Sequence, residues 1–403
     1  MIKAWQKPGI GQSYPVHKIY VELLTSNDTA RFINLVSKLH KHLKNNYNRR
    51  IMAHTLMFEA LGAKKFALKP YEAYNALALE AIKEAIPLND EPLNADLYIR
   101  YGTITDSGAE DLSYNIKALE IQKRYGFENF HFSQVRLQVV SGFLYDLGQY
   151  RQSIELGFEG VRLWESGLSR YSRHYYILQL DVLGADYKRL GMPDSSYYYY
   201  QKIYDSIQAA PLDDTYAQSM WLGISKGNIG QYYARRKNYG RALPLIQDYL
   251  QTSITWKDTF NIAMAQNSLG NVYFEQGNYH LAKSAWKQAR EMAETNSAVY
   301  FLYQLNIANK GLSSVYKAIG NTDSTAYYYE RYHETDLKLV ELQRDSFVPK
   351  VSARLVLDSL QFSAAKAVFE KTKTRDRSLG WIGLLVLIVV LTFLFFNLRG
   401  RKK

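Results

Sequence analysis

The sequence predicts an all-α protein, an α-solenoid of stacked helical hairpins followed by a single transmembrane helix. Apolar residues recur three and four positions apart over most of the chain, which places them on one face of a helix. No alternation of Val, Ile and Thr is long enough to predict a sheet. Turn-forming positions punctuate the pattern every 40 to 46 residues, at Gly108, Gly148, Gly191, Lys237, Gly277 and Gly320.

The clearest repeat unit lies at residues 269–289, where a turn at Gly277 separates two amphipathic helices. Gly270 and Ala282 are small where the two helices must approach closely, and Trp286 fills the space beside them. This pattern resembles the tetratricopeptide repeat (TPR), which has Leu-Gly, Tyr, Gly, Tyr, Ala and a large aromatic residue at these offsets. The resemblance implies a TPR-like superhelix of hairpins.

Four other units repeat the pattern, so the TPR-like array is predicted over residues 49–347, with the clearest repeats at 130–345. The spacing exceeds the ~34 residues of a minimal unit, which indicates longer helices or loops. The other predicted segments are a basic N-terminal helical segment at 1–48, an amphipathic juxtamembrane connector at 348–378, the transmembrane helix at 379–398 and a basic tail at 399–403.

The predicted transmembrane segment, residues 379–398, contains no charged residue. Its length matches the ~20 residues that cross a bilayer as a helix. Trp381 lies near one end and Phe395 near the other, where aromatic residues are common. These features predict a single-pass membrane protein that contacts the lipid bilayer through this segment. Lys and Arg flank both ends, so the charges leave the orientation open, and an array on the cytoplasmic side is an alternative.

The order of array, connector, span and basic tail is similar to that of bacterial membrane-anchored TPR sensor and regulator proteins. The resemblance implies a location in the bacterial inner membrane with a periplasmic array, and an output domain after the span. This chain shows no signal peptide before the array, and only residues 399–403 follow the span. We therefore expect any signal to pass through a partner.

Composition restricts the classes of function. The chain has 403 residues, 47% hydrophobic and 22% charged, which is ordinary for a folded protein. It has no cysteine, which excludes disulfides, thiol catalysis and zinc–thiolate sites. The net charge of +12 comes from the two ends of the chain rather than from one basic fold. We therefore predict that the array contacts no nucleic acid.

The resemblance to TPR proteins also implies a concave groove lined by the first helix of each hairpin. Positions that face this groove in the family correspond here to Gln138, Asp181, Lys188, Arg189, Gln231, Arg235, Asn267, Asn271, Glu275, Lys310 and Lys317. Their mixture of amides and cations suits an extended peptide or protein segment with some acidic character. The Lys–Asn pair of the family's carboxylate clamp is absent, and the alternative is that these residues are simply solvated.

No constellation for catalysis or metal binding stands out. The sequence has no phosphate-binding Gly-Lys-Ser/Thr loop, dinucleotide-binding glycine motif or Gly-x-Ser-x-Gly turn. His40 and His42 are two residues apart on a predicted helix, and they therefore point to different faces. Neither a catalytic site, a metal site nor a cofactor is predicted, and an enzyme is the least favoured class.

The favoured function is a membrane-anchored protein–protein interaction module, the sensing or ligand-binding part of a bacterial signalling or regulatory system. The alternative is a structural adaptor that tethers or assembles an envelope complex without signalling. The partner of either would be a protein or an extended peptide held in the groove of the repeat array.

Overall fold

The computed structural model describes residues 1–7, 18, 20, 22, 28–105, 108–130, 133–167, 173–296 and 299–345. The chain divides into two units, Met1–Lys350 and Val351–Lys403, and all of these residues belong to the first. Every regular element among them is a helix, and none is a strand. The prediction of an all-α helical-repeat solenoid is confirmed for this part of the chain.

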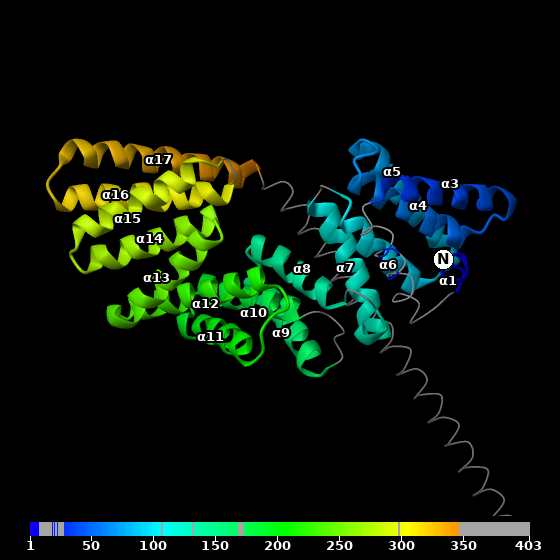
Figure 1. The fold of residues 1–403 in the computed structure, drawn as a ribbon, viewed down its shortest axis with the longest axis horizontal. Helices are drawn as coiled ribbons and strands as arrows, with labels where there is room; N and C mark the ends of the chain where they lie inside the picture. The colour runs from blue at the N-terminus through cyan, green and yellow to red at the C-terminus, as the bar shows by residue number, and fades with distance from the viewer. Residues whose placement is uncertain are drawn as a thin grey trace, which may run out of the picture. The chain divides into compact units, whose positions relative to one another are not determined.

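The helices follow one another as antiparallel hairpins (Figure 1). The N-terminal helices are α1 (Ile2–Trp5), α3 (Thr29–Asn45), α4 (Arg49–Lys65), α5 (Tyr71–Ala85), α6 (Glu91–Gly102) and α7 (Gly108–Tyr125), with short 3-10 helices η1 (Ile86–Leu88) and η2 (Phe127–Asn129). The later hairpins are α8 (Ser133–Asp146) with α9 (Tyr150–Glu165), α10 (Arg173–Arg189) with α11 (Pro193–Ala209), α12 (Thr215–Arg235) with α13 (Tyr239–Thr255), α14 (Thr259–Glu275) with α15 (Tyr279–Glu294), and α16 (Val299–Ala318) with α17 (Thr322–Asp345). We call α8, α10, α12, α14 and α16 the first helices.

The predicted turns lie between the two helices of these hairpins. Gly148, Gly191, Gly277 and Gly320 all have φ between +71° and +76°, a left-handed conformation that glycine adopts without a steric penalty. Lys237 occupies the equivalent turn with φ of +58°. Gly108 differs from the prediction, because it is the first residue of α7 rather than part of a turn.

Close packing at small residues joins each hairpin to the next. A Cβ atom on Gly270 of α14 would lie 2.6 Å from Nε1 of Trp286 on α15. A Cβ on Gly311 of α16 would overlap the same indole ring. Trp286 is only 2% exposed, so three successive helices are packed around one aromatic side chain.

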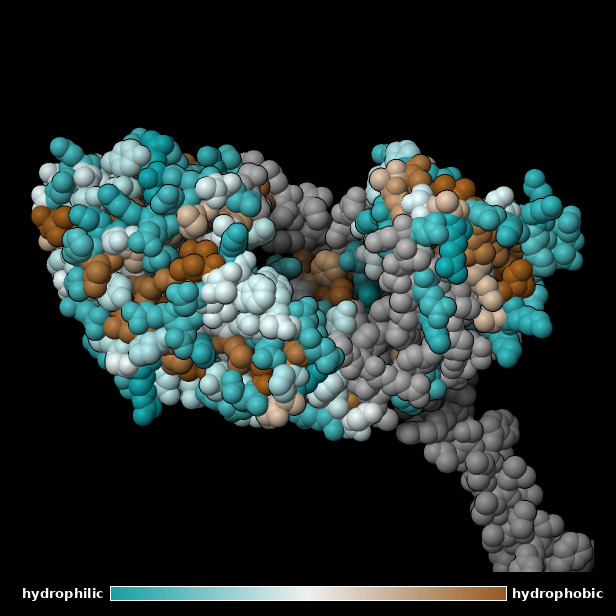
Figure 2. Space-filling model, viewed as in Figure 1, coloured by the Kyte–Doolittle hydropathy of each residue, from teal (hydrophilic) through white to brown (hydrophobic). Residues whose placement is uncertain are grey.

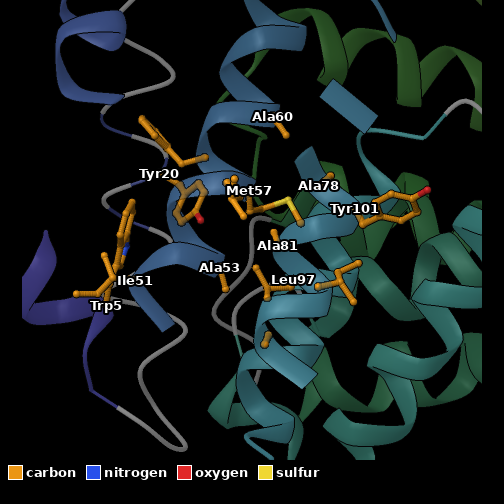
Figure 3. Close-up of a cluster of buried hydrophobic side chains, with 14 of the residues drawn as sticks. Trp5, Tyr20, Ile51, Ala53, Met57, Ala60, Ala78, Ala81, Leu97 and Tyr101 are labelled. Atoms are coloured by element: carbon orange, nitrogen blue, oxygen red, sulfur yellow. The ribbon is translucent and has the colours of Figure 1, made fainter. Parts of the chain in front are cut away.

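A separate core forms at the N-terminal end (Figure 3). Trp5 of α1 is fully buried, and its ring stacks on His54 of α4 with centroids 5.2 Å apart. The Tyr20 hydroxyl donates a hydrogen bond of 2.8 Å to the backbone carbonyl of His54. The Arg100 guanidinium lies 3.9 Å from the centroid of the Tyr20 ring. Burial, together with the charges of Arg100 and Arg50, lowers the pKa of His54 to about 3, so this histidine is neutral.

A polar cluster is buried between α8, α9 and α10. The Ser153 hydroxyl donates to the backbone carbonyl of Ser141 at 2.8 Å, and Gln179 Nε2 donates to Ser141 Oγ at 2.9 Å. Asp186 is fully buried, and neither carboxylate oxygen has a hydrogen-bond partner among the described residues. Burial raises the pKa of Asp186 to about 7, and the neighbouring Ser153 hydroxyl only partly offsets this effect.

The location expected from the sequence requires a correction. Among the described residues, no helix combines the length and the apolar character needed to cross a bilayer. This finding overturns the expectation of a single-pass protein of the bacterial inner membrane with a periplasmic array. The segments on which that expectation rested, the connector at 348–378, the span at 379–398 and the tail at 399–403, lie outside the described residues.

Glycine-to-alanine substitutions test the packing around Trp286. Gly270→Ala is expected to reduce stability by about 1 to 3 kcal/mol, because the buried indole cannot move away from the new methyl group. Gly142→Ala in α8 is the matched control, since nothing lies within 4 Å of its Cβ position. The control is expected to be neutral or stabilising by up to about 1 kcal/mol. Thermal and urea unfolding followed by circular dichroism would compare the two, and equal effects would contradict the packing argument.

The buried carboxyl group of Asp186 is expected to make stability depend on pH. The folded state keeps this proton up to about pH 7, whereas the unfolded state releases it near pH 4, so stability falls as pH rises through this window. Asp186→Asn is therefore expected to gain at least about 1 kcal/mol relative to the wild type between pH 4 and pH 8. Asp213→Asn, at an exposed carboxyl, is the control. Parallel pH profiles for wild type and Asp186→Asn would refute the expectation.

Candidate functional site

The first helices α10, α12, α14 and α16 contribute to one pocket with a volume of about 400 Å³, which we call the groove pocket. Its lining residues are Lys188, Gln231, Ala234, Arg235, Ile246, Met264, Asn267, Ser268, Asn271, Val272, Glu275, Gln304 and Ile307. Six of the eleven predicted groove residues are in this set: Lys188, Gln231, Arg235, Asn267, Asn271 and Glu275. The pocket is open to solvent and combines polar and apolar side chains.

A hydrogen-bonded row of side chains crosses the pocket from one hairpin to the next. Lys188 Nζ on α10 donates to Gln231 Oε1 on α12 at 2.8 Å, and also to Asn228 Oδ1 at 3.0 Å. Gln231 Nε2 in turn donates to Ser268 Oγ on α14 at 3.0 Å. Each of the three hairpins therefore fixes a polar side chain of its neighbour, which orients these groups before any ligand binds.

Side-chain hydrogen bonds also join α14 to α16. Asn267 Nδ2 on α14 donates to the Gln304 side chain on α16 at 3.1 Å and to its backbone carbonyl at 3.0 Å. Asn267 is only 3% exposed, and its Oδ1 has no hydrogen-bond partner among the described residues. Asn271, one turn further along α14, is exposed in the pocket. The Asn271 amide can therefore accept from and donate to a polypeptide backbone.

Positive charge gathers at the α10–α12 side of the groove pocket. Lys188 and Arg235 both line the pocket, and Arg235 has no ion-pair partner among the described residues. Burial is the main cause that lowers the pKa of Lys188 to about 8, and the charges of Arg235 and Arg189 add to it, while Asp181 opposes them. An anionic group placed here would relieve the repulsion between these cations.

Two further charged residues lie close to this side. Arg189 Nε donates to the Tyr145 hydroxyl at 3.0 Å, and this hydrogen bond is the main cause that raises the pKa of Arg189, while burial opposes it. Glu275 lines the pocket from α14, and its carboxylate accepts a hydrogen bond of 2.9 Å from Tyr239.

The other predicted groove residues do not line the groove pocket. Arg189 is held against Tyr145, and Asp181 lies beside Tyr200 in a partly buried position, where burial raises its pKa to about 6. Lys310 packs over the Tyr332 ring of α17, 5.6 Å from its centroid. Gln138 accepts a backbone hydrogen bond from Ser141, and Lys317 is exposed at the end of α16.

Sequence reasoning missed the apolar side of the site. Met264 of α14 and Ile307 of α16 line the pocket, and Ile307 is 40% exposed. Tyr300 and Tyr303 share its face of α16, at 52% and 41% exposure. Their spacing of three and four residues reads equally well as a core-facing stripe, so only the structure reveals their exposure. Figure 2 shows apolar residues interspersed with hydrophilic ones over the face formed by α12 to α17.

The described residues contain no group of three or more His, Asp or Glu side chains arranged to hold a metal ion. His40 and His42, the two histidines considered in the sequence analysis, both lie on α3. His40 Nε2 lies 2.8 Å from Glu59 on α4, and His42 is in the last turn of α3. The lining of the groove pocket offers hydrogen-bonding, charged and apolar side chains to a ligand.

Comparison with known proteins supports this class of fold. The sequence model of the tetratricopeptide repeat matches residues 262–295, which cover α14 from Ile262 onward and the whole of α15. No curated protein sequence matches the chain significantly. The repeat family is thus matched over one hairpin, and the rest of the array shares its helical-repeat geometry.

Solved structures include several of similar fold. The apo form of RapI has a TM-score of 0.53 and 16% identity, over 72% of this chain and 99% of RapI. The apo form of the quorum sensor NprR from B. thuringiensis has a TM-score of 0.49 and 14% identity, over 80% of this chain and 87% of that one. NprR in complex with its cognate peptide NprX has a TM-score of 0.48 and 14% identity, over 86% and 99%. At these identities, the likeness to RapI establishes the fold alone.

The titration of Lys188 can be measured by competitive amine labelling with mass spectrometry. We expect its labelling rate to rise with a midpoint near pH 8 rather than near 10.5. Arg235→Gln is expected to raise this midpoint, because it removes a neighbouring positive charge. Arg236→Gln is the matched control, since Arg236 pairs instead with Asp194 and is not among the groups that act on Lys188. A wild-type midpoint near 10.5 would contradict the electrostatic description of the pocket.

Proposed function

We propose that this protein binds an extended polypeptide segment in the groove pocket and acts in regulation as a sensing module, without catalysing a reaction. The observation that carries the proposal is the row of amide side chains that three hairpins hold in place across one open pocket. An extended polypeptide leaves its backbone N–H and C=O groups free to pair, and amide side chains can satisfy both.

Two features of the pocket favour a polypeptide over a small molecule. The pocket of about 400 Å³ is open to solvent rather than enclosed, so a chain longer than the pocket can extend beyond it. The polar groups come from four successive helices, which suits a ligand that extends over several repeats.

The proposal can be tested with a display library of random 12-residue peptides selected on the full chain. Binding of the selected peptides would be measured by fluorescence anisotropy. Asn271→Ala is expected to weaken binding about five- to tenfold, because it removes one amide that pairs with the peptide backbone. Gln208→Ala on α11 is the control, an exposed amide outside the groove pocket. Failure to select any peptide, or equal affinity for the two variants, would overturn the proposal.

A further inference from the structure

The lining of the groove pocket combines two kinds of surface, contributed by different helices. Lys188 of α10 and Arg235 of α12 form what we call the cationic side. Met264 of α14 and Ile307 of α16 form what we call the apolar side. All four side chains line the same space of about 400 Å³, so a ligand between them contacts both kinds of surface at once.

The apolar side continues beyond the pocket. Tyr303 and Tyr300 lie four and seven residues before Ile307, and therefore on the same face of α16. Their exposures of 41% and 52% leave a stripe of apolar surface over two turns of the helix. The Phe260 ring of α14 meets Tyr300 edge-on, with centroids 5.0 Å apart, which connects the stripe to the neighbouring first helix. Exposed aromatic side chains in a groove are typical of a binding surface.

The cationic side carries charge that the described part of the protein balances only in part, through the Asp181 carboxylate that acts on Lys188. Arg235 has no ion-pair partner there, and Lys188 donates to neutral amides rather than to a carboxylate. The carboxylate of Glu275 lies further along the pocket lining, where it accepts from Tyr239. A ligand with carboxylates facing Lys188 and Arg235 complements this charge.

From these observations we propose that the groove pocket selects an extended peptide in which acidic and apolar residues alternate. In an extended chain, successive side chains point to opposite sides, with a period of two. A chain lying over the pocket, with α10 and α12 on one side of it and α14 and α16 on the other, would thus direct every second side chain to the cationic side and the intervening ones to the apolar side. The exposed amide of Asn271 lines the same pocket, where it can pair with the backbone of such a peptide. This inference rests on the proposed function and specifies its ligand.

Synthetic peptides test the alternation directly. Three eight-residue peptides, acetylated and amidated, would be titrated into the full chain by fluorescence anisotropy or calorimetry: alternating Glu and Leu, the same composition arranged with helical spacing, and alternating Gln and Leu. The alternating Glu–Leu peptide is expected to bind at least about tenfold more tightly than either of the others. Preference for the helical arrangement would mean that the occupant is an amphipathic helix and would overturn the inference.

Substitutions with matched controls test which peptide side chains the cationic side and the apolar side bind. Arg235→Gln is expected to weaken binding of the Glu–Leu peptide without affecting binding of the Gln–Leu peptide. Its control is Arg236→Gln, which alters the arginine paired with Asp194 and is expected to leave the binding of both peptides unchanged. Ile307→Ser is expected to weaken both peptides, and Ile319→Ser, at an exposed isoleucine outside the pocket, is its control. Circular dichroism of each variant would verify the fold, and equal effects of a variant and its control would overturn the assignment.

Different outcomes would overturn the proposed function and the rule for its ligand. If the random library yields binders whose affinity depends on Asn271 but the alternating peptide does not bind, the ligand rule is wrong and the proposed function stands. If neither the library nor the alternating peptide binds, both are wrong.

Discussion

The architecture depends on the close approach of helices at positions where one of them lacks a side chain. In α10, a Cβ on Gly184 would lie 2.8 Å from the Tyr200 ring of α11, and in α14, Gly270 stands in the same relation to Trp286 of α15. These contacts set the separation within each hairpin, and the contact of Gly311 with Trp286 sets it between hairpins. Because the hairpins are spaced in this way, side chains of successive first helices come within hydrogen-bonding distance.

The repeat pattern predicted the fold well, because small and aromatic positions recur at fixed offsets in each unit. It predicted the site less completely. The family's rule for groove-facing residues selects the same positions in every repeat, whereas the pocket forms only where several repeats meet. Gln231 and Asn267 obey the rule and meet their neighbours in the pocket. Asp181 and Lys310 obey the same rule, but a nearby tyrosine, Tyr200 or Tyr332, occupies the space they face.

Long-range contacts explain what the sequence could not reveal. The sequence predicts a basic N-terminal helical segment at 1–48, and only the fold shows that Trp5 within it stacks on His54. Ile307 and Tyr303 have the spacing of buried helix positions, and their exposure follows from the absence of a covering element among the described residues. The predicted membrane segment had a strong local signal of length and composition, which the helices of the described array do not share.

The hydrogen-bonded row from Lys188 through Gln231 to Ser268 has a mechanical consequence. Its members belong to three hairpins, so a small rotation of one hairpin against the next would stretch these bonds and change the width of the space between them. A solenoid is held together by contacts between neighbours alone, which makes such rotations inexpensive compared with bending a single globular core. If a ligand binds in the pocket as proposed and changes its width, the angle between these hairpins must change with it, and so must the distance between the array's two ends.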